Sequence, residues 1–488
     1  MKIALISIRY EVSAMSQMSD YDRFLKLEED FNLFEFVVDG VKVWERIRFQ
    51  VFNAITRRSI KGASAQLTKQ SVLLRLKRLL FSIFAIKRNP LLTPRADFLF
   101  ICSARRLHEA DGLWWDIYTD PIMDALRSPF VAIETHFMNG HYRPEKTQTL
   151  RYFDFIDFIS FILRATRIAR ANLTREDIRT IRRIEQKILK DFKFQLNVEE
   201  LFRRTIEERK VRLPLYKLLL NRIRPNVVIL AQGYGWETMV EACKSSTIPT
   251  IELQHGVISQ ESAAYSFPSD FRKKEMFADY LFVFGDFWKS SANFPIQKSH
   301  IISVGYPHFE SERQKYSKLL KQKQILFISQ APVGEALSRI ASELGSIKDF
   351  GYRILYKLHP LERDGWREKY PWLIQSEVEV IDQKEDILYR LFAESLIQIG
   401  VYSTAIYEGL GYALRTFILD VPESIYSKAL FEGNLATKFA STSELKNLIE
   451  NSPSSNQVDI EYIFKSNAVE NIISAIKKIA NMKSFLRK

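Results

Sequence analysis

Short apolar runs alternate with helix-like segments through the second half of the chain, and this alternation constrains the fold more than any other feature. Pro225 opens the clearest unit, in which a strand at 226–231, a turn at Gly233-Tyr-Gly235, a helix at 236–244 and a strand at 250–253 follow one another. Short, continuously apolar strands are typical of parallel sheets that helices cover on both faces. The rhythm continues in strands predicted at 280–284, 301–304, 325–329, 353–358, 378–381, 395–399 and 415–419. The sequence therefore predicts an α/β protein with two doubly wound parallel sheets.

The length of 488 residues exceeds what one hydrophobic core usually fills and favours roughly two to three domains. A polar, basic stretch at 310–324 separates the two series of strands, and we place the domain boundary there. The first domain then spans 1–310 and the second 324–458, while 459–488 is predicted to be a helix that crosses back to the first domain. The first domain is expected to include strands at 3–8, 97–102 and 130–134 and helical insertions at about 40–95 and 145–222.

Composition and hydropathy indicate a globular, cytosolic protein. Apolar residues make up 46% of the chain and charged residues 26%, values far from those of disordered proteins. No apolar run approaches the ~20 residues of a membrane span, and the first residues show no small-residue cleavage pattern. Cys102 and Cys243 are too few for a disulfide framework and have no metal-ligand spacing, so both are expected to be buried, reduced thiols.

Positive charge is concentrated in one segment. Residues 41–95 contain thirteen Lys or Arg against one acid, Glu45, and so supply most of the net charge of +13. The apolar residues between 72 and 84 fall on one helical face of this segment. Such a helix can lie on an anionic membrane surface, or it can pack on its own domain and leave a solvated basic face. Basic clusters also suit nucleic acid, but we find no zinc spacing, repeat or RNA-binding signature and expect no nucleic-acid partner.

His255 follows one of the predicted strands directly and is flanked by Gln254 and Gly256. Ligands of open parallel sheets bind outside the carboxyl ends of the strands, so a polar residue at this point is a candidate for chemistry. The imidazole can serve as a general base for an acceptor hydroxyl or, when protonated, as a donor to a phosphate. The alternative is a core histidine bonded to a neighbouring carbonyl. Gln254, Gly256, Gly305 and Gln330 follow predicted strands as well and are expected to line the same cleft.

A second candidate is the run Lys357-Leu-His359-Pro360 at the end of another predicted strand. Proline ends the strand and fixes the histidine at the edge of the sheet, while Lys357 shares its side of the pleat two residues earlier. Two cationic groups then converge on one point. Charge-assisted hydrogen bonds from them would suit a diphosphate or a nucleotide leaving group. The alternative is an ordinary strand end with a solvated lysine.

The third candidate runs from Gly400 to Gly411, where a strand ends and a helix follows. Ser403 and Thr404 stand at the start of that helix, whose backbone amides and dipole would favour a bound phosphate. Glu408 lies one turn further on and is expected to accept hydrogen bonds from a ribose diol. The alternative makes Ser403 an N-cap and Glu408 a surface acid.

Taken in order, these three motifs resemble those of the GT-B glycosyltransferases of bacterial surface-polysaccharide synthesis. His-Gly, then Lys-x-His-Pro, then Tyr-Ser-Thr with a downstream acid is similar to the superfamily of CDP-glycerol glycerophosphotransferases, capsule Kdo transferases and bacterial sialyl- and polysialyltransferases. The similarity spans about 225–425. It implies a GT-B fold, in which an N-terminal acceptor domain and a C-terminal nucleotide-sugar donor domain face one another across a cleft.

The resemblance also implies roles for particular residues. His359, next to Lys357 and Pro360, would bind the donor phosphate with support from Ser403 and Thr404, and His255 would lie near the acceptor or the phosphate. Sialyltransferase-like members use an acidic pair before glycine as the general base, and Glu109-Ala-Asp111-Gly112 matches it in part. Ala110 interrupts the pair, so Asp111 is expected either to remove the acceptor proton or to stabilise its own turn.

The implied activity is an inverting, metal-independent transfer from a CMP-, UDP- or GDP-sugar to a saccharide or lipid-linked acceptor of a cell-surface polysaccharide such as capsule or lipopolysaccharide. No Asp-x-Asp metal signature occurs, and no cofactor beyond the nucleotide-sugar is expected. Teichoic-type enzymes show Trp-His-Gly-Thr where this chain has Gln254-His-Gly-Val257, which lowers but keeps open a CDP-polyol phosphotransferase. A non-catalytic basic protein that binds membranes or nucleic acid is the other alternative. The expected location is the cytoplasm, with the basic segment at the inner face of the plasma membrane.

Overall fold

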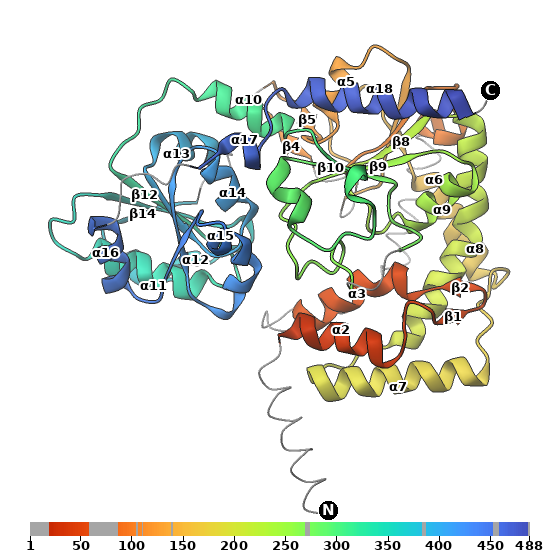
Figure 1. The fold of residues 1–488 in the computed structure, drawn as a ribbon, viewed down its shortest axis with the longest axis horizontal. Helices are drawn as coiled ribbons and strands as arrows, with labels where there is room; N and C mark the ends of the chain where they lie inside the picture. The colour runs from red at the N-terminus through yellow and green to blue at the C-terminus, as the bar shows by residue number, and fades with distance from the viewer. Residues whose placement is uncertain are drawn as a thin grey trace, which may run out of the picture.

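The computed structural model describes residues 19–57, 86–103, 106–109, 111–137, 140–268, 274–382, 387–451 and 458–486. The strand predicted at 3–8 and the basic amphipathic helix predicted at 72–84 lie outside these residues. The described chain forms two α/β domains, each built on one parallel sheet (Figure 1).

The first sheet has seven strands in the order β11-β10-β9-β8-β3-β6-β7, and all neighbouring strands are parallel. Its strands are β3 (Phe98–Ile101), β6 (Phe130–Glu134), β7 (Arg151–Tyr152), β8 (Val227–Leu230), β9 (Thr250–Leu253), β10 (Tyr280–Val283) and β11 (Ile301–Ser303). From β3 the chain builds outward through β6 and β7 on one side, then returns to β8 and continues on the other side. The sheet is therefore doubly wound, and its topological switch point lies between β3 and β8.

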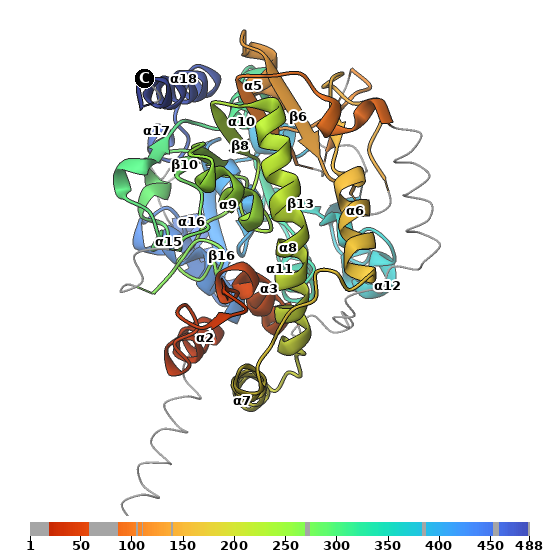
Figure 2. The same ribbon diagram turned by 90° about the vertical axis from the view of Figure 1, so that its right-hand side faces the viewer.

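Alternate residues of β3 show how the first sheet is covered. Phe98 and Phe100 pack with α5 (Asp120–Ala125) and α18 (Ala468–Leu486) on one face of the sheet. Leu99 and Ile101 pack on the other face with α6 (Asp154–Ala165), α8 (Val198–Ile223) and α9 (Glu237–Ser245). Successive side chains of a strand point to opposite faces, so a strand covered on both sides must be apolar at every position. Figures 1 and 2 show α18 across the sheet on one side and α8 along the other.

The second sheet has six parallel strands in the order β14-β13-β12-β15-β16-β17, with its switch point between β12 and β15. The strands are β12 (Gln324–Ile328), β13 (Arg353–Lys357), β14 (Val378–Ile381), β15 (Ile397–Gly400), β16 (Arg415–Leu419) and β17 (Thr437–Phe439). The flanking helices are α11 (Gly334–Gly345), α12 (Trp366–Lys369), α13 (Leu388–Glu394), α14 (Thr404–Leu410), α15 (Lys428–Glu432) and α16 (Thr442–Asn451). Two Rossmann-like sheets of this order form the two-domain GT-B architecture, which confirms the predicted fold class.

Two strands of the parallel sheets were not foreseen from the sequence. β7 lies within 145–222, which was predicted to be helical and otherwise forms α6, α7 (Arg175–Phe192) and α8. β17 extends the second sheet beyond the last predicted strand. Both are short edge strands of two or three residues, too short to show a periodic pattern of their own.

A separate helical layer packs beneath the first domain (Figure 1). It consists of α2 (Asp20–Asp30), the hairpin β1 (Val37–Val38) and β2 (Val41–Lys42), and α3 (Trp44–Arg57), with α7 below them. Arg48 of α3 forms an ion pair with Glu28 of α2, and both side chains are only 1% exposed. Arg48 also donates to the backbone carbonyls of Ala263 and Ser266 in the loop after β9. This one guanidinium therefore fixes the helical layer against the first α/β domain.

The chain crosses between the domains twice, through α10 (Pro307–Lys315) and through α17 (Ile460–Ile463). The returning segment passes directly over the ends of β10 and β11. A Cβ on Gly285 would lie 2.4 Å from the carbonyl oxygen of Tyr462, and a Cβ on Gly305 would lie 2.2 Å from that of Lys465. Glycine is required at both positions because the two backbones approach so closely. Past this point α18 packs on the first sheet.

No helix in the described part of the chain combines the length and the hydropathy that a membrane span requires. Both cysteines, Cys102 and Cys243, are buried, and they form no disulfide.

Candidate functional site

The first and third sequence motifs meet between the two domains. A Cβ built on Gly256 would have Thr404 Oγ1 as a neighbour at 3.8 Å, an ordinary van der Waals distance. Gly256 follows β9 of the first sheet, and Thr404 begins α14 after β15 of the second sheet. The carboxyl ends of the two sheets therefore face each other, which is where ligands of doubly wound sheets bind.

His255 is held in one orientation by its neighbours. Its Nδ1 lies 3.3 Å from the carbonyl oxygen of Leu253, and its Nε2 lies 3.1 Å from the hydroxyl of Tyr234. The Tyr118 hydroxyl donates to the backbone carbonyl of His255 at 2.8 Å. A proton on Nδ1 satisfies the Leu253 carbonyl and leaves Nε2 as an acceptor. Burial lowers the pKa of His255 to about 4, against a smaller raising effect of the Leu253 carbonyl, so the imidazole is neutral near pH 7.

The turn before α9 places Tyr234 against this histidine. A Cβ on Gly233 would lie 2.1 Å from Glu252 Oε2, and Gly235 has a φ of +86°, so both flanking residues are glycine for steric reasons. The Gly233 amide donates to Glu252 Oε1 at 2.8 Å, and the Tyr265 hydroxyl donates to the same oxygen at 2.7 Å. Tyr265 in turn lies 3.5 Å from His255 Nδ1. A buried carboxyl, which the sequence did not single out, thus supports the ring of residues around His255.

Gln254 and Gln330 brace the strand ends. The Gln254 side chain accepts from the amide of Phe284 at 2.9 Å and donates to the carbonyl of Gly256 at 2.9 Å, so it joins the ends of β9 and β10. Gln330 Oε1 accepts from the amide of Tyr402 at 3.3 Å and bridges the switch point of the second sheet. Both residues lie at the predicted edge, and both use their amides to hold its shape.

His359 caps the short helical turn 360–362 that follows β13. Its Nδ1 accepts from the amide of Leu361 at 3.2 Å, and its own amide donates to Glu362 at 3.0 Å. Pro360 is the first residue of the turn, where its missing N–H costs nothing. Because Nδ1 accepts a hydrogen bond, the ring proton of neutral His359 lies on Nε2. Lys357 ends β13 and is only 8% exposed, so it is not the freely solvated lysine of the alternative interpretation.

The hydroxyls and the acid of the third motif have different surroundings. Ser403 is the N-cap of α14, and its Oγ accepts from the amide of Ala405 at 3.3 Å. Glu408 is buried, at 8% exposure, and is not a surface acid. Burial raises the pKa of Tyr306 well above its usual value, with further contributions from Tyr118 and the Glu408 carboxylate. Glu408 therefore lies near Tyr306, and its contact with a ribose stays a prediction.

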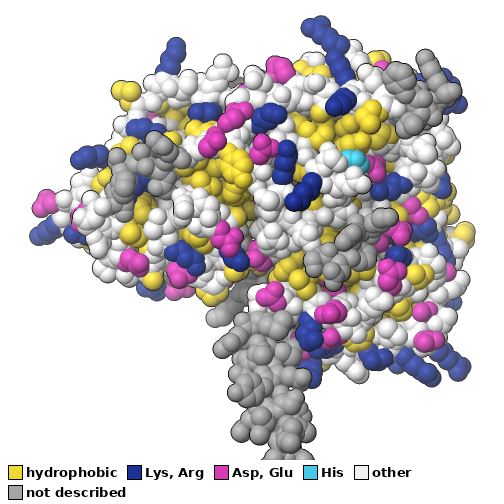
Figure 3. Space-filling model, viewed as in Figure 1, with side chains coloured by type: hydrophobic (Ala, Val, Ile, Leu, Met, Phe, Trp, Pro, Cys, Tyr) yellow, Lys and Arg dark blue, Asp and Glu magenta, His cyan; other side chains and the backbone are white. Residues whose placement is uncertain are grey.

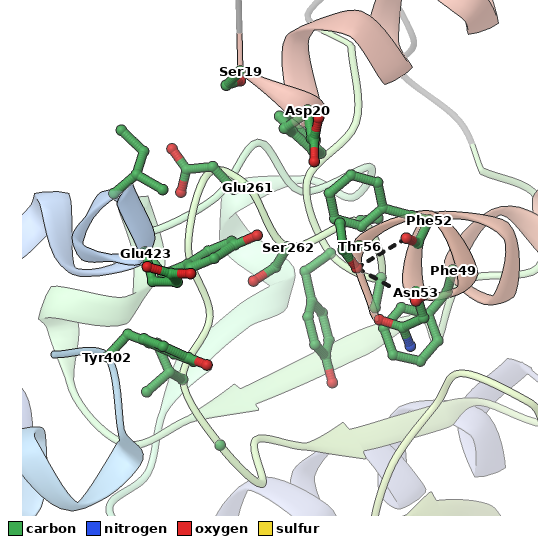
Figure 4. A pocket seen from close by; sticks show the side chains of 18 of the residues that line it. Ser19, Asp20, Phe49, Phe52, Asn53, Thr56, Glu261, Ser262, Tyr402 and Glu423 are labelled. Atoms are coloured by element: carbon green, nitrogen blue, oxygen red, sulfur yellow. Dashed lines mark hydrogen bonds between the residues drawn. The ribbon is translucent and has the colours of Figure 1, made fainter. Parts of the chain in front are cut away.

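A cavity of about 940 Å³ opens beside His255 and Gly256, between the domains. Its walls come from three parts of the chain (Figure 4). The helical layer contributes Ser19, Asp20, Tyr21, Phe49, Phe52, Asn53 and Thr56; the first sheet contributes Tyr234, His255, Gly256, Val257 and Glu261–Tyr265; the second domain contributes Pro332, Tyr402, Pro422, Glu423, Ile425 and Tyr426.

The part of this wall formed by α3 was missed in the sequence, although a signal was present. Phe49, Phe52, Asn53 and Thr56 recur at the i, i+3, i+4, i+7 spacing of one helical face. The strong positive charge of 41–95 instead favours a prediction of this segment as a surface that binds other molecules. In the structure the same helix turns a mixed aromatic and polar face toward the cleft.

Two other predicted residues lie elsewhere. Asp111 is exposed, and its carboxylate accepts from the Leu113 amide at 2.9 Å and from Trp115 Nε1 at 3.1 Å, within the hairpin of β4 (Leu107–His108) and β5 (Trp114–Trp115). It does not line the cavity. Gly305 packs under Lys465 and Ala468 at the crossing of the chain, away from the cavity walls. The two hydrogen bonds of Asp111 correspond to its interpretation as a residue that stabilises its own turn.

Much of the described basic segment is neutralised. Arg46 pairs with Glu241 at 2.6 Å, Lys42 with Glu35 at 3.1 Å and with Glu275 at 3.3 Å, and Arg88 with Glu145 at 2.8 Å. On the face shown in Figure 3, basic and acidic side chains are interspersed over both domains. Contact with an anionic membrane therefore depends on residues outside the described ranges and stays a prediction. Among the described residues no group of three His, Cys, Asp or Glu has metal-binding geometry.

We expect Glu252 to make stability depend on pH. Burial raises its pKa to about 7, against the lowering effects of the Tyr265 and Gly233 hydrogen bonds. Between the ordinary value of 4.5 and 7 the folded protein binds more protons than the unfolded chain, so stability falls as pH rises through this window. The full difference is about 3 kcal/mol at about 1.4 kcal/mol per pH unit. Denaturant unfolding at pH 4.5 and 7.5 should show this loss in the wild type and not in Glu252→Gln.

The low pKa of His255 acts in the opposite direction between pH 4 and 6.5, but it is common to both proteins and cancels in their difference. An equal pH dependence in the two proteins would show that Glu252 is ionised in the folded state.

Comparisons with known proteins give structural likeness only. Neither a family model nor a curated protein matches the sequence. Solved structures similar to the chain include a UDP-GlcNAc 2-epimerase from Methanocaldococcus jannaschii (11% identity, 78% of this chain and 99% of the other, TM-score 0.47), MurG from Acinetobacter baumannii (12%, 78% and 99%, 0.40) and a trehalose 6-phosphate synthase from Burkholderia multivorans (9%, 81% and 100%, 0.43). These identities and TM-scores are low. The GT-B fold is established by the chain's own sheet order, in which two doubly wound parallel sheets meet at their carboxyl ends.

Proposed function

We propose that the protein is a nucleotide-sugar-dependent, inverting glycosyltransferase. The observation that carries this proposal is the close approach of Gly256 and Thr404, from opposite sheets, beside a cavity of about 940 Å³ that His255 lines. Group transfer between two substrates needs both of them at one point, and two sheet edges that face each other across a cavity offer such a point. The motif resemblance supports a sugar donor and a cell-surface polysaccharide or glycolipid as the product.

The proposed donor site is the edge of the second sheet. His359 Nε2–H and the Lys357 ammonium would bind the diphosphate or phosphate of a CMP-, UDP- or GDP-sugar, with Ser403 and Thr404 at the same edge. Lys357 and His359 are two residues apart on one extended segment and so share a side. Glu408 would accept hydrogen bonds from the ribose. The Lys357 ammonium and the His359 N–H donor would stabilise the charge of the departing phosphate without a metal ion.

The proposed chemistry is an in-line displacement. The acceptor hydroxyl oxygen bonds to the anomeric carbon while the bond from that carbon to the phosphate oxygen breaks, which inverts the configuration. The hydroxyl proton moves to a base, and the leaving oxygen takes the bonding electrons. His255 is neutral, lines the cavity and has an acceptor nitrogen, Nε2, which would exchange its Tyr234 partner for the acceptor hydroxyl, so it is the stronger candidate for the base. Asp111 would need its hairpin to move to take this role.

A thermal-shift titration with CMP, CDP, UDP and GDP tests the donor site. One nucleotide should raise the melting temperature of the wild type by an amount that grows with its concentration. His359→Ala should lower the affinity for that nucleotide tenfold or more, because a charge-assisted hydrogen bond contributes about 1.5 to 3 kcal/mol to binding. His300→Ala, at the start of β11, is the matched control and should bind like the wild type. The proposal fails if no nucleotide shifts the wild type, or if His359→Ala binds as tightly.

A further inference from the structure

We infer that the cavity between α3 and the second domain binds an uncharged saccharide, which serves as the acceptor. This inference deepens the proposed function, and the role of the saccharide as acceptor rests on that function. It concerns the chemical class of the ligand, which the three sequence motifs leave open. The residues of the cavity walls are the evidence for this ligand class.

One wall is suited to the apolar faces and hydroxyl edges of sugar rings. Phe49 of α3 presents an aromatic ring beside the largely buried Phe52, while Asn53 and Thr56 of the same helical face present a carboxamide and a hydroxyl (Figure 4). The Thr56 hydroxyl donates to the carbonyl of Phe52 at 3.0 Å, which leaves its oxygen lone pairs as acceptors for a ligand. A pyranose ring has C–H groups on its faces and hydroxyls around its rim. Aromatic side chains with polar neighbours match both features.

The opposite wall carries negative charge. Glu261 and Glu423 lie across the cavity from α3, and Asp20 lies above them (Figure 4). Asp20 forms an ion pair with Arg23. Burial raises the pKa of Glu261, hydrogen bonds from its own backbone amide and from Ser259 and the charge of Lys428 lower it, and the charge of Asp22 raises it. Among the described residues that line the cavity, none is Lys or Arg. A phosphate or carboxylate ligand would meet like charge here, whereas sugar hydroxyls can donate to the carboxylates.

The two sides of the cleft therefore differ in charge. The proposed donor edge holds Lys357 and His359, and the cavity holds three acids. Opposite chemistry at adjacent sites would direct the anionic nucleotide to one and the uncharged saccharide to the other, because each wrong placement leaves charges without partners. The volume of about 940 Å³ is at the upper end of the usual range for small-ligand pockets of about 300 to 1,000 Å³, so it has room for more than one sugar unit.

A printed glycan array with uncharged and anionic glycans tests the inference. The full chain, biotinylated and held on streptavidin, gains avidity for weak single-site binding. We expect the bound glycans to be uncharged. Phe49→Ala should weaken binding at least tenfold, while Phe161→Ala, a matched change at an exposed position of α6, should have no effect. Glu261→Gln combined with Glu423→Gln should raise binding of anionic glycans relative to the wild type, and Glu368→Gln on α12 should not.

The inference is overturned if the bound glycans are anionic, if the wild type binds none, or if Phe49→Ala binds as the wild type does. The nucleotide titration on the same proteins separates this outcome from failure of the proposed function. Nucleotide binding that depends on His359, without binding of uncharged glycans, removes only the acceptor inference. Uncharged glycan binding without nucleotide binding keeps a saccharide site and removes the transferase.

Discussion

His255→Ala should lower kcat for sugar transfer by about 10²- to 10⁴-fold and leave nucleotide binding unchanged. A general base that takes the acceptor proton contributes about this much to the rate. His255 lines the cavity, whereas the nucleotide is expected at the edge of the second sheet, so the two effects should separate. The measurement is the rate of nucleotide release from the donor sugar that the titration identifies, together with the thermal shift of the same variant.

The pH profile distinguishes a base from a structural residue. Because burial lowers the pKa of His255 to about 4, its basic form persists as pH falls from 7 toward 4. The activity of the wild type should therefore show no loss near pH 6.5 that comes from this group and should fall only toward pH 4. His300→Ala should keep the wild-type kcat. Full activity in His255→Ala would assign proton removal to another residue, with Asp111 the next to be changed.

Arg48→Met should destabilise the fold by about 3 to 5 kcal/mol, the usual cost of breaking a buried ion pair from one side. Glu28 accepts from Arg48 Nε at 2.6 Å and from Trp44 Nε1 at 2.6 Å, and it would remain buried without its cation. The carbonyls of Ala263 and Ser266 would lose their donor as well. Chemical denaturation monitored by tryptophan fluorescence measures this difference.

Two further variants control this experiment. Arg390→Met removes an i,i+4 pair with Glu394 in which the arginine side chain is 59% exposed, and it should change stability by less than about 1 kcal/mol. Glu28→Gln together with Arg48→Met should recover part of the loss, because no buried charge is left alone. If Arg48→Met were as stable as Arg390→Met, the helical layer would not depend on this guanidinium. Loss of glycan binding in Arg48→Met would follow from movement of the cavity wall.

The candidate site was foreseeable where chemistry follows a strand. His255, Gly256, Lys357, His359, Ser403 and Thr404 all lie at or shortly after the ends of apolar runs whose length and composition indicate buried parallel strands, and in the structure they lie at or within a few residues of the ends of β9, β13 and β15. Asp111 is predicted from a partial motif match some residues beyond the strand at 97–102, and its carboxylate accepts hydrogen bonds within its own hairpin. A continuous apolar run marks the end of a strand reliably, because a strand that is buried on both faces of a sheet must be apolar at every position.

Tertiary structure decided which of these residues share a cavity and what else lines it. Phe49 and Glu423 are more than 370 positions apart in the sequence, and nothing near either of them specifies the other. Likewise Arg48 belongs to the most basic segment of the chain, yet its guanidinium forms a buried ion pair with Glu28. The sequence alone determined the two doubly wound sheets and their polar edges, because strand periodicity and burial are local properties of the chain. The domain contact, the acidic and aromatic cavity and the neutral state of His255 arise from long-range packing and desolvation, and only the folded structure determines these.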